Sequence, residues 1–166
     1  MQTPPAPAGP TVCLTCSLGG HLEQIRKLQD IYQDFDHFFV VPDEGSGTFS
    51  PDPGIRHYTL PDINEGRGLR NPAALIRSFA RAWKILRAES PAVVISTGAG
   101  VTVPVVLLAK LLRIPTVFVE SFARVQAPSR AGRVCHPFVD LFLVQHEELL
   151  AHYPRARYLG SLYEHL

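Results

Sequence analysis

Two short glycine-rich turns carry the residues best suited to chemistry. One reads Ser17-Leu18-Gly19-Gly20-His21 and the other Ser96-Thr97-Gly98-Ala99-Gly100. Each turn follows an apolar run and precedes a helical pattern, and glycine at such a junction lets the backbone approach a ligand closely. The free N–H groups and positive dipole end of the following helix favour an anion. We therefore expect both turns to bind an anionic ligand. The expected contacts are Ser17, Gly19, Gly20, Ser96, Thr97, Gly98 and Gly100, with Arg124 from a third segment.

The spacing of these glycines does not match the common nucleotide-binding loops. Neither turn reads G-x-G-x-x-G, and no lysine follows the glycines as it does in a P-loop. We therefore expect neither dinucleotide nor ATP binding, and we interpret Asp43 as a loop residue rather than a ribose-binding acid. The first turn leaves two alternatives open: a phosphate cradle beside the titratable His21, or a tight turn followed by a surface histidine.

Glu120 directly follows a predicted buried strand at residues 116–119. Its carboxylate could accept a hydrogen bond from a ligand hydroxyl, accept a proton, or pair with Arg124, and the composition does not separate these roles. Cys13 and Cys16 have the spacing of a redox or zinc pair. Positions three apart on a strand point to opposite faces, so one metal ion cannot easily reach both sulfurs. We expect two buried thiols and no metal site.

The order of apolar runs predicts the elements that position these residues. Strands are expected at 11–16, 38–41, 55–60, 92–95, 116–119, 140–144 and 157–159, and helices at 22–32, 72–89, 101–112, 128–134 and 146–152. This alternation is typical of a Rossmann-like, doubly wound α/β domain with a parallel sheet. With the strand order 3-2-1-4-5-6, both glycine turns would flank the crevice at the carboxyl edge of the sheet.

The helix at 72–88 combines an apolar face with a basic one. The apolar positions are Leu75, Ile76, Phe79, Trp83 and Leu86, and the basic ones are Arg77, Arg81, Lys84 and Arg87. One interpretation is a core face opposite a solvated face. The other is docking on an anionic membrane surface. The expected membrane contacts are Arg67, Arg70, Arg77, Arg81, Trp83 and Lys84.

The bulk properties narrow the class of protein. The 166 residues carry a formal net charge of +1, so no global attraction to nucleic acid is expected. The three cysteines have no paired spacing across the chain as a whole and so do not form a disulfide framework, which favours a reducing compartment. The apolar run at 101–112 is too short to span a bilayer and is interpreted as a core helix. We expect a disordered tail at residues 1–10 and a single Rossmann-like domain at residues 11–166.

Several of these segments resemble bacterial polysaccharide-biosynthesis proteins of the PssD/EpsE type. The matching motifs are SLGGHL (17–22), VVISTGAGV (93–101), VFVESFARV (117–125), PFVDLFLVQ (137–145) and YLGSL (158–162). These proteins are related to the membrane-anchoring subunit of the split N-acetylglucosaminyltransferase that makes dolichol-linked chitobiose. The resemblance covers residues 11–162, and residues 71–120 more distantly resemble the N-terminal half of the MurG-type glycosyltransferase.

The resemblance implies a GT-B glycosyltransferase divided between two proteins. This chain would be the N-terminal, acceptor-side half, while a separate subunit would bind the UDP-sugar; no cofactor is expected on this chain. Both glycine turns would face the diphosphate of the acceptor. His21 would be the first candidate for the catalytic base and Glu120 the second. The eukaryotic subunit has an N-terminal membrane anchor that this sequence lacks, so we expect peripheral binding at the cytoplasmic face of the membrane.

The expected reaction is an inverting transfer of N-acetylglucosamine or another hexose to a polyprenyl-diphosphate-linked sugar. The alternative is a non-catalytic scaffold that recruits a competent glycosyltransferase to the membrane. A free-standing nucleotide-binding Rossmann protein is a further alternative. We expect this chain to be inactive without its partner subunit. The segment at about 155–166 is expected to dock that partner through Tyr158, Leu159 and Leu162.

Overall fold

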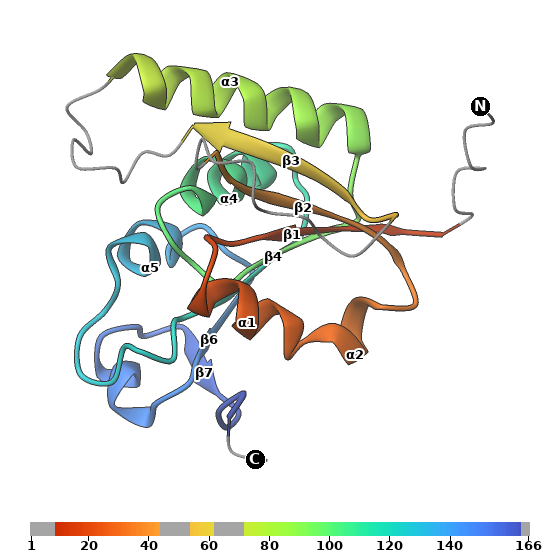
Figure 1. Ribbon diagram of the computed structural model, residues 1–166. Coiled ribbons are helices and arrows are strands. Elements are labelled where there is room, and N and C mark those ends of the chain that lie inside the picture. The colour runs from red at the N-terminus through yellow and green to blue at the C-terminus, as the bar shows by residue number, and fades with distance from the viewer. Residues whose placement is uncertain (1–8, 44–53, 62–71, 164–166) are drawn as a thin grey trace.

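Seven parallel strands form one sheet in the order β3-β2-β1-β4-β5-β6-β7. The computed structural model describes residues 9–43, 54–61 and 72–163 (Figure 1). The strands are β1 (Thr11–Thr15), β2 (Asp36–Asp43), β3 (Arg56–Pro61), β4 (Val93–Ser96), β5 (Thr116–Val119), β6 (Leu141–Val144) and β7 (Ala156–Tyr158). The predicted parallel sheet, its strand order and the Rossmann-like fold class are confirmed.

Helices cover both faces of this sheet (Figure 1). They are α1 (Gly20–Arg26), α2 (Gln29–Tyr32), α3 (Pro72–Glu89), α4 (Thr102–Leu111), α5 (Arg130–Cys135) and the 3-10 helix η2 (Glu147–Ala151). The single helix predicted at 22–32 is wrong: the chain forms α1 and α2 instead. Leu28 N–H bonds to Ile25 O at 2.9 Å, three residues back, and this tighter turn interrupts the α-helical pattern.

The core lies on both sides of the sheet because successive strand residues point to opposite faces. In β1, Cys13 packs with Val94 and Val105 toward α3 and α4, whereas Leu14 packs with Ile25 of α1. Cys16 lies in the same cluster as Leu14, so the two thiols are buried on opposite faces, as predicted. Burial raises the pKa of Cys16 to about 12, so the thiol stays protonated. Within the described ranges, no three His, Cys, Asp or Glu side chains gather as a metal ion would require.

The predicted core face of α3 is wrong in its details. The buried residues of this helix are Ala74, Ser78, Ala82, Ile85 and Leu86. Ile76 is 68% exposed and Trp83 is 37% exposed. The small side chains lie inward because α3 packs closely on α4 and β3. The larger apolar residues are left at the surface, beside Arg77, Arg81 and Lys84, which are also exposed.

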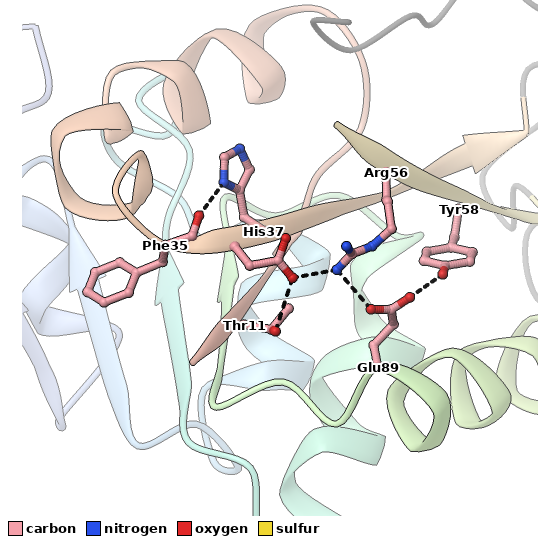
Figure 2. Close-up of polar contacts among 7 residues, drawn as sticks. Thr11, Phe35, His37, Arg56, Tyr58 and Glu89 are labelled. Carbon is pink, nitrogen blue, oxygen red and sulfur yellow. Dashed lines mark hydrogen bonds and ion pairs between the residues drawn. The ribbon is translucent and has the colours of Figure 1, made fainter. Parts of the chain in front are cut away.

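A polar network anchors the end of α3 to the amino edge of the sheet (Figure 2). Arg56 at the start of β3 bonds to Asp36 at 2.6 Å and to Glu89 at 3.1 Å. Tyr58 donates a hydrogen bond to Glu89, and this bond together with burial raises the pKa of Tyr58. Thr11 of β1 donates to Asp36 at 3.1 Å. The network joins three strands to α3 at the edge opposite the glycine turns, so it fixes the helix on the sheet.

Candidate functional site

The two glycine turns meet at the carboxyl edge of the sheet, where β1 and β4 are neighbours. His21 Nδ1 lies 2.7 Å from Thr97 O, and Thr97 Oγ1 donates to His21 O at 2.8 Å. A methyl group on Gly98 would lie 3.4 Å from His21 Cε1. The reciprocal bonds hold the turns together, so the predicted placement of both turns at one edge of the sheet is confirmed.

The bond to Thr97 fixes the chemistry of the His21 ring. A carbonyl oxygen only accepts, so Nδ1 carries the hydrogen of this bond. In the neutral ring, Nε2 is then the nitrogen with a free lone pair. His21 is partly exposed at the carboxyl edge of the sheet. His21 therefore presents a nitrogen that can take a proton from a bound hydroxyl group.

The backbone of both turns depends on positive φ angles. Gly19 has φ 70° at the start of α1, and Gly98 has φ 99° before α4. Ala99 follows with φ 79°. The first N–H groups of an α-helix have no acceptor within the helix and can bind an anion. At the start of α4, however, Thr102 N and Val103 N already donate to Ala99 O and Gly100 O of the turn, at 3.2 and 3.1 Å.

The side chains of Ser96 and Thr97 serve the turn itself. Both residues are fully buried. Ser96 Oγ accepts a hydrogen bond from Gly98 N at 3.1 Å, and Thr97 Oγ1 is bonded to His21 O. These hydroxyl groups hold the local backbone and do not reach the surface of the crevice. We therefore correct their expected role: they shape the turn, and the backbone is left to contact a ligand.

Glu120 is fully buried, and its carboxylate is surrounded by donors. Oε1 accepts from Ser121 N at 2.9 Å, and Oε2 accepts from the backbone N–H and hydroxyl of Ser129 at 3.2 and 3.1 Å. Tyr153 OH also donates to Oε2, at 2.5 Å. The pKa of Tyr153 is raised, mainly by burial and to a lesser extent by this bond. A side chain at Gly132 would collide with both groups. The carboxylate therefore fixes the loop 121–129 between β5 and α5, an arrangement that disfavours Glu120 as the base.

Arg124 lies in this loop with an exposed side chain. Glu120 is held by the serines and Tyr153, so the arrangement does not support the alternative in which Glu120 pairs with Arg124. Ser17 is partly buried at the end of β1 and forms a long bond of 3.4 Å to Leu18 O. Arg67 and Arg70, expected at the membrane, lie outside the described residues.

Two buried glutamines at this edge were not predicted. Gln24 is 4% exposed and Gln145 is 3% exposed. Gln145 Nε2 donates to Gln24 Oε1 at 2.6 Å and to Glu120 O at 2.9 Å. Gln145 directly follows β6, as Glu120 follows β5, so the rule that polar residues gather at the carboxyl ends of strands could have found it. Gln24 lies within a helical pattern that contains no comparable signal.

The C-terminal segment forms a pocket beyond the ends of β6 and β7. The pocket has a volume of about 370 Å³. Its lining residues are Phe122, Gln145, His146, Glu147, Glu148, Tyr158, Ser161 and Tyr163. Of the three residues expected to dock a partner, Leu159 is 76% exposed, Tyr158 lines the pocket, and Leu162 donates its N–H to Gln145 at 3.1 Å.

The sequence matches the family model described as "Oligosaccharide biosynthesis protein Alg14 like" over residues 67–162. The "UDP-N-acetylglucosamine transferase subunit alg14" of Schizosaccharomyces pombe is 37% identical over 100 residues, which cover 52% of this chain and 48% of the relative. The human subunit ALG14 is 30% identical over 178 residues, covering 92% of this chain and 82% of the relative. The chain thus spans about half of the fission-yeast relative but most of the human one.

The likeness extends to enzymes that act on undecaprenol-linked substrates. A protein from Shouchella clausii is 37% identical over 102 residues, which cover 61% of this chain and 28% of the relative. It is named UDP-N-acetylglucosamine--N-acetylmuramyl-(pentapeptide) pyrophosphoryl-undecaprenol N-acetylglucosamine transferase. The crystal structure of MurG from Acinetobacter baumannii superposes with a TM-score of 0.69 at 19% identity, covering 84% of this chain and 43% of that one. The fold is therefore that of one half of a GT-B enzyme.

Proposed function

Because the chain belongs to the family of Alg14-like oligosaccharide biosynthesis proteins, we propose that it is the acceptor-binding subunit of a two-component UDP-sugar glycosyltransferase. The names of the relatives support N-acetylglucosamine as the transferred sugar. The acceptor would be a sugar linked through diphosphate to a polyprenyl lipid. The partner subunit would bind the UDP-sugar. A role in bacterial polysaccharide synthesis of the PssD/EpsE type is the finer form of this proposal.

The observation that carries the proposal is the contact between His21 and the second glycine turn. Nδ1 is held by Thr97 O at 2.7 Å, which leaves Nε2 free to accept a proton from the acceptor hydroxyl. The oxygen of the acceptor hydroxyl then bonds to the anomeric carbon of the donor sugar as the bond from this carbon to UDP breaks. UDP leaves with the bonding electron pair, and the proton remains on His21. An imidazole with one ring nitrogen held by a carbonyl oxygen and the other able to accept a hydrogen is suited to this transfer.

The acceptor diphosphate would lie against the two turns. The turns that precede α1 and α4 follow β1 and β4, which are adjacent in the sheet, so backbone groups of both turns would be within reach of one diphosphate. Gly19, Gly20 and Gly100 present backbone without a bulky side chain, so phosphate oxygens can approach closely. Arg124, exposed in the neighbouring loop, would add a positive charge.

The main alternative is a scaffold that only recruits a competent enzyme, and Gly98→Ala tests it. The added methyl would contact His21 at a backbone with φ 99°, so the turn or the histidine must shift. We expect kcat of the two-subunit complex to fall by about tenfold to a hundredfold, as misplaced catalytic groups usually cause. The control is Gly54→Ala, which has φ 97° but open space around it. Unchanged kcat for Gly98→Ala in an intact complex would favour the scaffold.

We place the protein at the cytoplasmic face of the membrane, bound peripherally through α3. Ile76 and Trp83 are exposed there beside Arg77, Arg81 and Lys84. Apolar side chains next to cationic ones suit the boundary between lipid tails and anionic headgroups. Arg87 lies over the Trp83 ring with 5.7 Å between its Cζ and the ring centroid. In the described part of the chain, no helix combines the length and apolar character that crossing a bilayer needs.

Replacing Arg77, Arg81 and Lys84 together with glutamine is expected to weaken binding to anionic vesicles. The loss should be about 1 kcal/mol for each charge at low salt. Flotation with phosphatidylserine vesicles measures it. The control variant replaces Arg113, Arg130 and Arg157 with glutamine, which removes the same charge from exposed positions outside α3. Equal flotation of both variants would contradict docking through α3.

A further inference from the structure

A chain of hydrogen bonds, buried at its centre and partly buried at its ends, runs from the C-terminal segment to the first glycine turn. Leu162 N donates to Gln145 Oε1 at 3.1 Å, and Gln145 Nε2 donates to Gln24 Oε1 at 2.6 Å. Gln24 Nε2 in turn donates to Gly20 O at 3.1 Å. We propose that Gln24 and Gln145 are positioning residues that couple residues 158–163 to the glycine turn that carries His21.

The side-chain amide of Gln145 forms hydrogen bonds through both its nitrogen and its oxygen. Both hydrogens of its amide nitrogen are donated, one to Gln24 Oε1 and one to Glu120 O at 2.9 Å. The oxygen of Gln24 also accepts from Phe122 N at 3.0 Å. Burial makes an unmade bond at either side chain costly, so the two amides adopt one arrangement together. A shift of Leu162 therefore changes the surroundings of α1.

A second contact ties the same segment to α1. The Lys27 ammonium lies 4.6 Å from the centroid of the Tyr163 ring, and this ring packs against Phe122 with 4.5 Å between centroids. The segment thus bridges α1 and the loop after β5. Both links lie beside the pocket formed by Tyr158, Ser161 and Tyr163, among others.

The consequence rests on the proposed function and on the expectation that the partner subunit docks on the segment at about 155–166 through Tyr158, Leu159 and Leu162. A partner that orders this segment would also order the turn around His21, because one set of hydrogen bonds joins them. Residues 158–163 would then act in two ways: they would bind the partner and they would prepare the acceptor site.

Hydrogen exchange of the Glu23 amide, followed by NMR, tests the coupling in the full chain. This amide donates to Gly19 O at 3.1 Å, so it reports on the turn. Gln24→Leu and Gln145→Leu are each expected to speed its exchange about tenfold, because each leaves buried groups unpaired. The matched control is Gln33→Leu, which alters an exposed glutamine whose side chain donates to Asp30 at 3.4 Å. Unchanged exchange in both test variants would overturn the proposal.

The UDP-sugar-binding partner subunit provides the second arm. Adding it to the wild-type chain should slow Glu23 exchange, and this protection should be lost in Gln24→Leu although the variant still binds the partner. If Gln24 had only a structural role, its replacement would not remove protection of the Glu23 amide while leaving partner binding intact. Equal protection in the wild type and Gln24→Leu would overturn the coupling while leaving the proposed function intact. Protection in a complex that transfers no sugar would sustain the coupling and contradict the proposed function.

Discussion

Replacing His21 with alanine is expected to lower kcat of the assembled two-subunit enzyme by about a hundredfold or more, the usual contribution of a general base. The expectation rests on the bond of 2.7 Å between His21 Nδ1 and Thr97 O, which leaves Nε2 to accept the proton. The KM for the UDP-sugar should change little, because the donor is bound by the other subunit. Steady-state kinetics with both substrates varied measures this separation.

His37→Ala provides the control for a lost imidazole. His37 lies in β2 near the amino edge of the sheet, where its Nδ1 is 2.9 Å from Phe35 O (Figure 2). This variant should leave kcat close to that of the wild type. Wild-type turnover by His21→Ala in a folded, intact complex would remove His21 from the mechanism. The buried, fully bonded carboxylate of Glu120 would then have to be reconsidered as the base.

The sheet was predictable because its strands are short, apolar and separated by clear turns. The run at 116–119 coincides with β5, and the two glycine turns could be placed together once β1 and β4 were expected to be neighbours. This is a consequence of topology: parallel strands place their carboxyl ends at one edge. The hydrogen bonds between His21 and Thr97 agree with that placement, but they were not predicted.

Side-chain direction at this edge was not predictable. Ser96 and Thr97 looked suited to a ligand, yet both are buried: Ser96 bonds within its own turn, and Thr97 bonds to the first turn at His21 O. Glu120 looked suited to proton transfer, but the serines and Tyr153 occupy its carboxylate. Such roles depend on partners distant in sequence, such as Tyr153, 33 positions away, which spacing alone does not identify.

In α3, the hydrophobicity pattern did not identify which side chains are buried. One of the two interpretations placed the largest apolar residues of α3 in the core, but Ala74, Ser78 and Ala82 are buried there together with Ile85 and Leu86. Close packing against α4 and β3 selects small side chains, and a hydrophobicity pattern ranks them below Ile76 and Trp83. This difference is informative, because α3 has exposed apolar residues beside its basic ones.

We also expect a large effect of the partner subunit on sugar transfer. The 166-residue chain covers 43% of the MurG chain, and its described residues form one parallel sheet with the two glycine turns at its carboxyl edge. In a GT-B enzyme the donor sugar is held by a second Rossmann domain across the crevice, as the resemblance implies. The purified chain is therefore expected to bind UDP-sugar weakly and to transfer none of it.

The measurement that tests this account most directly is sugar transfer by the purified chain before and after its partner is added. UDP-N-acetylglucosamine carrying a radiolabelled sugar and a polyprenyl-diphosphate-linked acceptor sugar are incubated with each subunit alone and with both. We expect label in the lipid fraction only when both subunits are present, and its loss when this chain carries His21→Ala. Robust transfer by this chain alone, or by the partner alone at the rate of the pair, would contradict the account.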